Sequence, residues 1–329
     1  VTLANGYQSA VSNTWGHGFL DVKSALLPIG QMTVNAGGGQ TINANQPLVM
    51  AGSATGGAIA ASLEKVNLFA TDLFAGAFSL NAASLVQNSA PESLFTDQTA
   101  ALNGRAEAPR ALSADLFDRD PTVQSFIGDL HVATYLPVHS GQFETAGVSF
   151  GKRHLTSFGH VDWQAGVGSD NGALLPLWQN ENGQDLASFG VSLNSKWGAG
   201  QLDVSTVMAT APATGNTSQV MLNSSEFSYS VSSVFDRNDR LKMSLRQPFA
   251  ITSGSTDLTL AVFSGGTTQM QTIAVDLAPS KREFQITMDY EIEIERDTDL
   301  MLSLVHALNR GHVAGVEETG VFMGFRKTF

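Results

Sequence analysis

The chain has 329 residues, enough for one large or two modest domains with a buried core. It contains no cysteine, which excludes disulfides, thiolate metal sites and a cysteine nucleophile. Acidic residues outnumber basic ones 30 to 18, and the net charge of −12 argues against nucleic acid as a partner. The 32 glycines favour many short strands joined by turns.

Hydropathy along the chain argues against a membrane-spanning helix, because no run of about 18 apolar residues occurs. Residues 1–6 also show neither the basic segment nor the apolar core of a signal peptide. If the chain enters a membrane, it must therefore do so as a closed β-barrel, in which every backbone group is paired.

Residues 1–30 contain one compact signal. Gly16 and Gly18 permit a tight backbone path, and Asp21 is suited to cap a short helix over residues 22–27, which Pro28 ends. The spacing Gly-x-Gly-x-[aliphatic]-Asp-x-x-x-Ala is matched at Gly16, Gly18, Leu20, Asp21 and Ala25.

This pattern resembles the last element of the subtilisin-like protease (subtilase) domain. The resemblance implies that residues 1–30 are the C-terminal edge of such a domain. A subtilase needs an Asp, a His, a Ser and an oxyanion-hole Asn, and none of their motifs occurs here. By the family's order they would precede Val1, so no catalytic residue is expected in this chain.

Residues 31–121 are predicted to form a strand-rich spacer. Glycine clusters separate apolar stretches such as residues 66–70 and 77–80. A short helix is possible around residues 94–102.

From about residue 122 the pattern changes to period-two alternation, which predicts strands with one apolar and one polar face. Similar, shorter alternations occur at residues 189–193, 227–231, 241–245, 258–262 and 300–304. About ten to twelve strands are expected in a C-terminal β-domain over residues 122–329, as an antiparallel barrel or, alternatively, a sandwich. The clearest strand, residues 284–295, places Phe284, Ile286, Met288, Tyr290, Ile292 and Ile294 on one side.

The C-terminal segment places Val321, Met323, Phe325 and the final Phe329 on one face. It resembles the terminal strand of Gram-negative outer-membrane barrels. In those proteins the barrel-assembly machinery recognises the alternate apolar positions and the final Phe of that strand. Lys327 departs from that pattern, although a lysine near the rim of a barrel costs little. Residues 275–283 and 311–315 resemble the C-terminal part of autotransporter-type subtilases.

These resemblances imply the C-terminal part of a secreted serine endopeptidase. Its β-domain would anchor or export the upstream protease domain of the same polypeptide at the outer membrane, giving an outer-membrane or extracellular location. The alternative is a soluble accessory β-domain that binds substrate or stabilises the protease, with its apolar strand faces buried against each other.

Other candidate sites are weaker. Ser149 lies in a Gly-x-Ser-x-Gly sequence, but no amphipathic helix follows, and Val148 and Phe150 favour a strand. The seven histidines lack helical metal-ligand spacing, and residues 118–120 and 236–239 lack the glycine and distal Glu of a calcium loop. No metal or cofactor is therefore predicted. Glu291, Glu293 and Glu295 would face water in a sandwich, or the lumen of a barrel, where they would favour cations.

Overall fold

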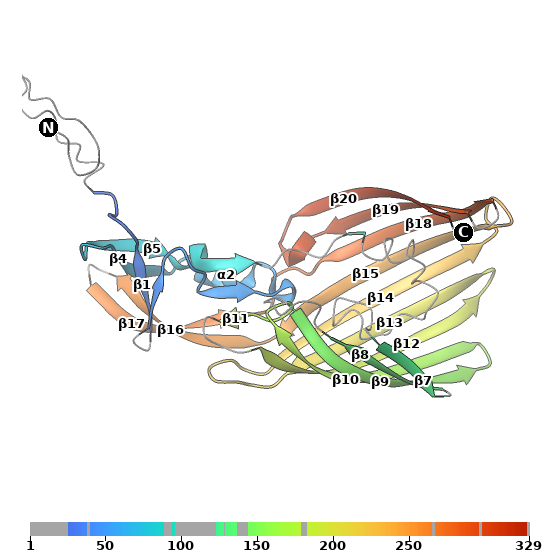
Figure 1. Cartoon of the computed structure of the whole chain (residues 1–329), viewed down its shortest axis with the longest axis horizontal. Coiled ribbons are helices and arrows are strands. Elements are labelled where there is room, and N and C mark those ends of the chain that lie inside the picture. Colours follow the sequence, from blue (N-terminus) through green and yellow to red (C-terminus); the bar gives the residue numbers. More distant parts are fainter. Residues whose placement is uncertain are drawn as a thin grey trace, which may run out of the picture.

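The protein is mainly β, with antiparallel sheets and one α-helix among the described residues (Figure 1). No helix in this part of the chain is long and apolar enough to cross a membrane. The structure is a computed structural model. It describes residues 26–37, 40–88, 94–95, 123–127, 129–136, 144–178, 183–264, 267–295 and 298–327.

The large sheet has eleven strands in the order β20-β19-β18-β15-β14-β13-β12-β10-β9-β8-β7. Every neighbouring pair is antiparallel. Within the described residues β7 and β20 are its two edges, and no pairing joins them. The strands are β7 (Val123–Ile127), β8 (Leu130–Tyr135), β9 (Glu144–Thr156), β10 (Gly159–Asn171), β12 (Gln184–Trp197), β13 (Gly200–Ala211), β14 (Val220–Ser232), β15 (Asp239–Ser253), β18 (Phe284–Glu295), β19 (Thr298–Leu308) and β20 (Glu317–Lys327).

The connections of this sheet differ in length at its two ends. From β9 onward, one end carries residues 157–158, 198–199, 233–238 and 296–297, and we call it the short-turn end. The other carries residues 172–183, 212–219, 254–283 and 309–316, and we call it the long-loop end. The strand β20, the last one described, runs from the long-loop end towards the short-turn end.

A second region, the front unit, consists of residues 26–88 and the hairpin β16–β17, and it lies beyond the long-loop end (Figure 1). Its six-stranded sheet has the order β17-β16-β4-β1-β2, with β5 also paired to β4. The hairpin thus leaves the large sheet between β15 and β18. These strands are β1 (Thr33–Gly37), β2 (Gln40–Asn43), β4 (Asn67–Thr71), β5 (Ala77–Asn81), β16 (Ser255–Ser264) and β17 (Thr267–Asp276).

Smaller elements complete the junction between the two regions. The strand β11, from the β10–β12 connection, pairs with β3, which pairs in parallel with β6. These elements are β3 (Val49–Ala51), β6 (Val86–Asn88), β11 (Leu177–Trp178), η1 (Ser53–Thr55), α2 (Ala58–Leu63), η2 (Ala82–Leu85) and η3 (Arg310–His312).

The apolar core lies within the front unit and continues into the long-loop end of the large sheet. Ile59 of α2 and Leu68 of β4 are fully buried, and so are Leu175, Leu222 and Leu260 from the connections and strands that reach the junction. Burial of such side chains supplies about 1.5–3 kcal/mol each. The front unit is therefore held to the large sheet by a continuous hydrophobic cluster.

The predicted strands are present. Residues 284–295 form β18 with the predicted bounds, and the alternations at 189–193, 227–231, 241–245 and 300–304 lie in β12, β14, β15 and β19. The strand at 258–262 is β16, which pairs with β4 of the front unit rather than within the large sheet. The short helix α2 was not predicted.

Other predictions fall partly or wholly outside the described residues. The expected helix at 22–27 is described only at Leu26 and Leu27, in a turn and a bend, and that at 94–102 only at Leu94 and Phe95, in a turn. The division into 1–30, 31–121 and 122–329 remains a prediction.

Candidate functional site

One face of the large sheet, the outer face, carries large apolar side chains that are exposed. They occur on every strand from β9 to β20, and their exposed fractions run from 37% at Val204 to 74% at Met323. The set comprises Val148, Phe150, Val167, Phe189, Val204, Met208, Phe227, Met243, Leu245, Ile286, Met288, Leu302, Leu304, Val321, Met323 and Phe325.

The strand register joins these side chains into one band. Val204 lies opposite Phe227, which lies opposite Leu245. Met288 lies opposite Met243 on one side and Leu304 on the other. Directly opposed side chains are about 5 Å apart at Cβ, so the band is contiguous. Soluble monomers rarely expose apolar patches larger than a few hundred Å².

The other face of the same strands, the inner face, is polar and far less exposed. Ser149, Gln164, Ser228 and Ser303 are all nearly or fully buried. The Gln164 amide donates to the Ser149 hydroxyl at 2.6 Å, from β10 to β9. The polarity of the large sheet is therefore inverted with respect to a water-soluble sheet, which buries its apolar face.

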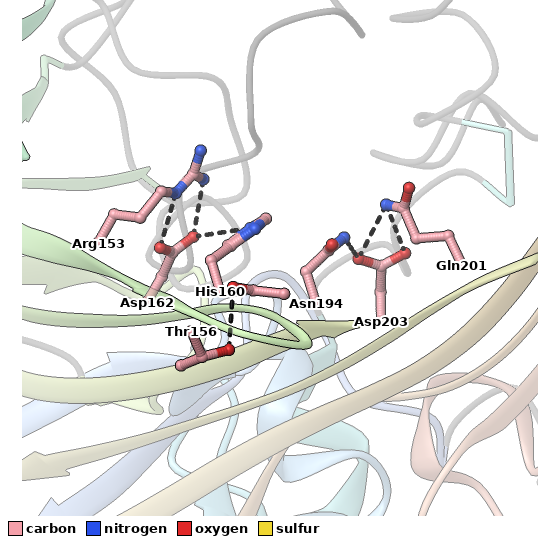
Figure 2. A network of polar contacts seen from close by, with 8 residues as sticks. Arg153, Thr156, His160, Asp162, Asn194, Gln201 and Asp203 are labelled. Carbon is pink, nitrogen blue, oxygen red and sulfur yellow. Dashed lines mark hydrogen bonds and ion pairs between the residues drawn. The ribbon is translucent and has the colours of Figure 1, made fainter. Parts of the chain in front are cut away.

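Charged side chains of the inner face are paired across neighbouring strands, as Figure 2 shows for β9 to β13. Arg153 makes a two-pronged ion pair with Asp162, at 2.9 and 2.8 Å, and His160 Nε2 lies 3.7 Å from the same carboxylate. In the next strand pair, the Asn194 amide donates to Asp203.

The same pairing continues on the remaining strands. Lys242 of β15 lies 3.6 Å from Glu226 of β14. The Ser303 hydroxyl donates to Asp289, and Arg326 of β20 forms an ion pair with Asp299 of β19. These charged groups thus have ion-pair or hydrogen-bond partners on neighbouring strands, which lowers the cost of burying them.

A described piece of the chain between the front unit and β7 lies against the inner face. The ring of Phe95 stacks on Phe322 of β20, with centroids 5.5 Å apart. A Cβ at Gly320 would lie 2.4 Å from Phe95 Cζ, so the ring approaches the backbone of β20 closely and would have to shift if this glycine were replaced.

Aromatic side chains gather on the outer face near the short-turn end. Trp197 and Tyr229 pack edge to face at 6.2 Å, and Phe235 and Tyr290 do so at 5.8 Å. The Tyr229 hydroxyl donates to the Trp197 carbonyl at 3.1 Å. Phe158, 54% exposed, lies in a turn at the same end. Trp and Tyr favour positions where an apolar environment meets a wet one.

At the long-loop end, a buried polar cluster ties the last loop to β18. One oxygen of Glu283 accepts from Arg310 Nη1 at 2.7 Å, and the other accepts from the Gly311 amide at 2.7 Å. His312 Nδ1 accepts from the Glu283 amide at 2.9 Å, so its Nε2 donates to the Phe249 carbonyl at 2.8 Å. Burial lowers the pKa of His312, against the opposing attraction of Glu283.

This cluster and the β10–β12 connection both pack closely against the front unit. A Cβ at Gly56 would lie 2.6 Å from that of His312, and one at Gly52 would lie 2.3 Å from the Leu174 carbonyl. The Ser53 amide donates to the Ala173 carbonyl at 2.7 Å. Sequence reasoning noted residues 275–283 and 311–315 only as a resemblance and missed this junction.

The structure describes part of the predicted site residues. Val321, Met323 and Phe325 share the exposed outer face of β20, and Lys327 follows at its end. Gly16, Gly18, Asp21, Ala25 and Phe329 lie outside the described residues.

Ser149 is fully buried in the interior of β9, and no turn from strand to helix occurs there. Val148 and Phe150 share the opposite, exposed face, as predicted. In the described part of the chain, no group of three or more potential metal ligands is found.

Comparison of the chain with protein-family models, curated proteins and solved structures finds no match. Its function must therefore be inferred from the large sheet and the elements attached to it.

Proposed function

We propose that the large sheet is an outer-membrane β-domain that anchors or exports an upstream subtilisin-like serine protease of the same polypeptide. The observation that carries the proposal is the inverted polarity of the sheet. A contiguous apolar outer face costs free energy in water, about 25 cal/mol per Å², and none in hydrocarbon. A polar, charge-paired inner face suits a lumen.

Strand length supports insertion. A tilted strand needs about 9–11 residues to cross the hydrocarbon core. Strands β9 to β20 of the large sheet have 11 to 15 residues. In lipid the free edges of β7 and β20 would leave backbone groups unpaired, so the inserted sheet must close into a barrel.

The two ends of the sheet support an orientation. Outer-membrane barrels have short periplasmic turns, longer extracellular loops and aromatic girdles at the membrane boundaries. Here the short turns, the C-terminal end of β20 and the aromatic cluster around Trp197 share one end of the sheet, which we assign to the periplasm.

The front unit supports the display of an upstream domain. It lies at the long-loop end, so a domain that precedes it in the chain would lie on the outside of the cell. The subtilase-like motif at Gly16, Gly18, Asp21 and Ala25 precedes the front unit in the sequence. That motif is the reason for proposing a protease as the exported domain.

The alternative, a soluble accessory domain, requires the apolar strand faces to bury against each other. Separate antiparallel sheets are present, as a sandwich requires. However, no described element covers the outer face, and side chains such as Phe189 and Met288 remain 52% and 42% exposed. The geometry therefore favours the membrane proposal.

A pair of adjacent substitutions in β18 tests insertion. Met288→Lys puts a charge in the middle of the outer face and should destabilise the inserted protein by about 2–4 kcal/mol. Thr287→Lys, one residue away on the inner face, should cost much less. Membrane fractionation and heat-modifiable gel mobility report the result. Recovery of the wild type as a detergent-free soluble monomer, with Met288→Lys equally stable, would overturn insertion.

The protease part needs its own test, with the polypeptide that includes the sequence upstream of Val1. A fluorophosphonate probe, which labels reactive serines, should label that polypeptide in the membrane fraction. Absence of labelling in a folded, membrane-bound product would overturn the protease assignment and leave the anchor intact.

A further inference from the structure

The strand β17 is an edge strand of the front-unit sheet. Its exposed part, residues 267–272, contains none of the features that usually prevent an edge strand from pairing with another chain. Within the described residues it pairs only with β16, in an unbroken register. Residues 267–272 are all exposed, and the first charge of the strand is Asp276. Exposed edges are normally blunted by lysine, proline or a bulge, because they are templates for pairing with another strand.

The register shows which backbone groups of β17 face this edge. The Leu277 amide donates to the Gly254 carbonyl at 3.1 Å, one step beyond the last pair of the ladder. Because bonded and non-bonded pairs alternate, the odd-numbered residues of β17 bond to β16. The amide and carbonyl groups of Thr268, Met270 and Thr272 therefore point away from β16.

The sequence of the edge is symmetric about Met270. Residues 268–272 read Thr-Gln-Met-Gln-Thr in either direction. If two copies of β17 pair antiparallel about Met270, that residue lies opposite itself and Thr268 lies opposite Thr272. These are the three residues whose backbone groups point outward, so the centre of symmetry falls on a hydrogen-bonded pair. Opposed threonines are also a favourable cross-strand pair.

We propose that β17 binds β17 of a second copy of this chain, joining the two front-unit sheets into one across a two-fold axis at Met270. Such an interface uses the same patch twice and closes at two copies. The hairpin extends along the long axis of the molecule, away from the large sheet (Figure 1). The two-fold axis therefore places the two large sheets at opposite ends of the dimer. This inference does not depend on membrane insertion.

Disulfide trapping tests the register, because the wild type has no cysteine. Across a hydrogen-bonded pair the Cα atoms are about 5.5 Å apart, within the range that a disulfide spans. Oxidation of Met270→Cys should give a covalent dimer on a non-reducing gel. Thr272→Cys is the matched control: it lies about 13 Å from its own copy and should not cross-link alone. It should cross-link when mixed with Thr268→Cys.

A second variant tests the interface without a cross-link. Met270→Pro removes an amide that points outward and leaves the ladder to β16 intact, a position at which edge strands tolerate proline. Sedimentation of the full chain, in whichever solvent keeps it monodisperse, should show a dimer for the wild type and a monomer for Met270→Pro, with unchanged circular dichroism. A monomeric wild type, or Met270→Cys that cross-links no better than Thr272→Cys, would overturn the proposal.

Discussion

The front unit and the large sheet treat apolar side chains in opposite ways. In the front unit, Val34, Ile59 and Leu68 are fully buried. Along β4, the buried Leu68 and Ala70 alternate with more exposed positions. In the large sheet, Ser149 and Ser303 are buried, whereas Phe189 and Met323 are exposed. One chain thus contains a region that is stabilised by excluding water and a region whose pattern suits an apolar surrounding.

The two regions also differ in what binds their charged side chains. In the front unit Asp72 is near the surface, where amides including that of Ile29 bind its carboxylate and lower its pKa. In the large sheet charges such as Arg153 and Asp162 pair on the inner face, where backbone groups are already used by the ladders. In both regions charged side chains bind groups close to them. In the front unit the example, Asp72, lies near solvent, whereas in the large sheet the paired charges lie on the inner face.

Breaking the buried pair at the junction should have the largest effect, because the junction holds the two regions together. Glu283→Ala removes the acceptor of the Gly311 amide and leaves the buried Arg310 with the more exposed Glu318 at 3.2 Å as an ion-pair partner. The two losses together should cost about 3–5 kcal/mol in the free energy of unfolding. Arg326→Ala, on the inner face at 30% exposure, is the control and should cost about 1 kcal/mol. Denaturant titration measures both. Equal costs would contradict a structural role of the junction.

Truncation of one leucine in each region sharpens the comparison. Leu68→Ala removes a fully buried side chain of the front unit and should cost about 2–4 kcal/mol. Leu304→Ala, on the outer face and 40% exposed, should cost about 1 kcal/mol or less. Thermal unfolding in the same detergent compares them. A larger loss at Leu304 would mean that the outer face is packed against protein.

The junction should weaken in acid. Burial lowers the pKa of His312 below its usual 6.5, so the unfolded chain takes up a proton at a higher pH than the folded one. Stability from this residue is complete above pH 6.5 and decreases as the pH falls below it. Hydrogen exchange at the Glu283 amide should speed up between pH 7 and pH 5, after correction for intrinsic rates. His306→Gln, outside the junction, should leave that trend unchanged.

The smallest effect is expected at the aromatic cluster. Trp197 is 65% exposed on the outer face, so brominated acyl chains should quench part of the tryptophan emission. Trp197→Phe should lower the quenched fraction and change stability by no more than about 1 kcal/mol. Quenching that persists unchanged in this variant would place Trp197 away from lipid.

Periodicity sufficed to predict the strands but not their partners. The alternation at Phe284 to Ile294 could only be a strand, and β18 has the predicted bounds. The same alternation at residues 258–262 gave no sign that β16 would leave the large sheet, because strands of both sheets share one period. The helix α2 has only six residues and follows two glycines, which read as a turn.

The candidate site was predicted in part for similar reasons. The apolar face of β20 follows from its own sequence, since Val321, Met323 and Phe325 are spaced by two. The junction does not, because Glu283 and His312 are 29 residues apart in the chain and meet only through the pairing of β18 with β19. The orientation of each face, towards solvent or interior, also depends on the curvature of the whole sheet.

The strand β15 passes almost directly into β16, with only Gly254 between them. At Gly254 the backbone has φ +152°, which residues with a side chain rarely adopt. Residues 239–264 therefore form one extended span of about 85 Å, from the short-turn end to the tip of the front unit. Tension applied to the β16–β17 hairpin reaches β15 through Gly254 and β18 through residues 277–283. Each of these two strands is paired on both sides in the large sheet, so this load falls on the middle of the sheet and not on its weaker edges.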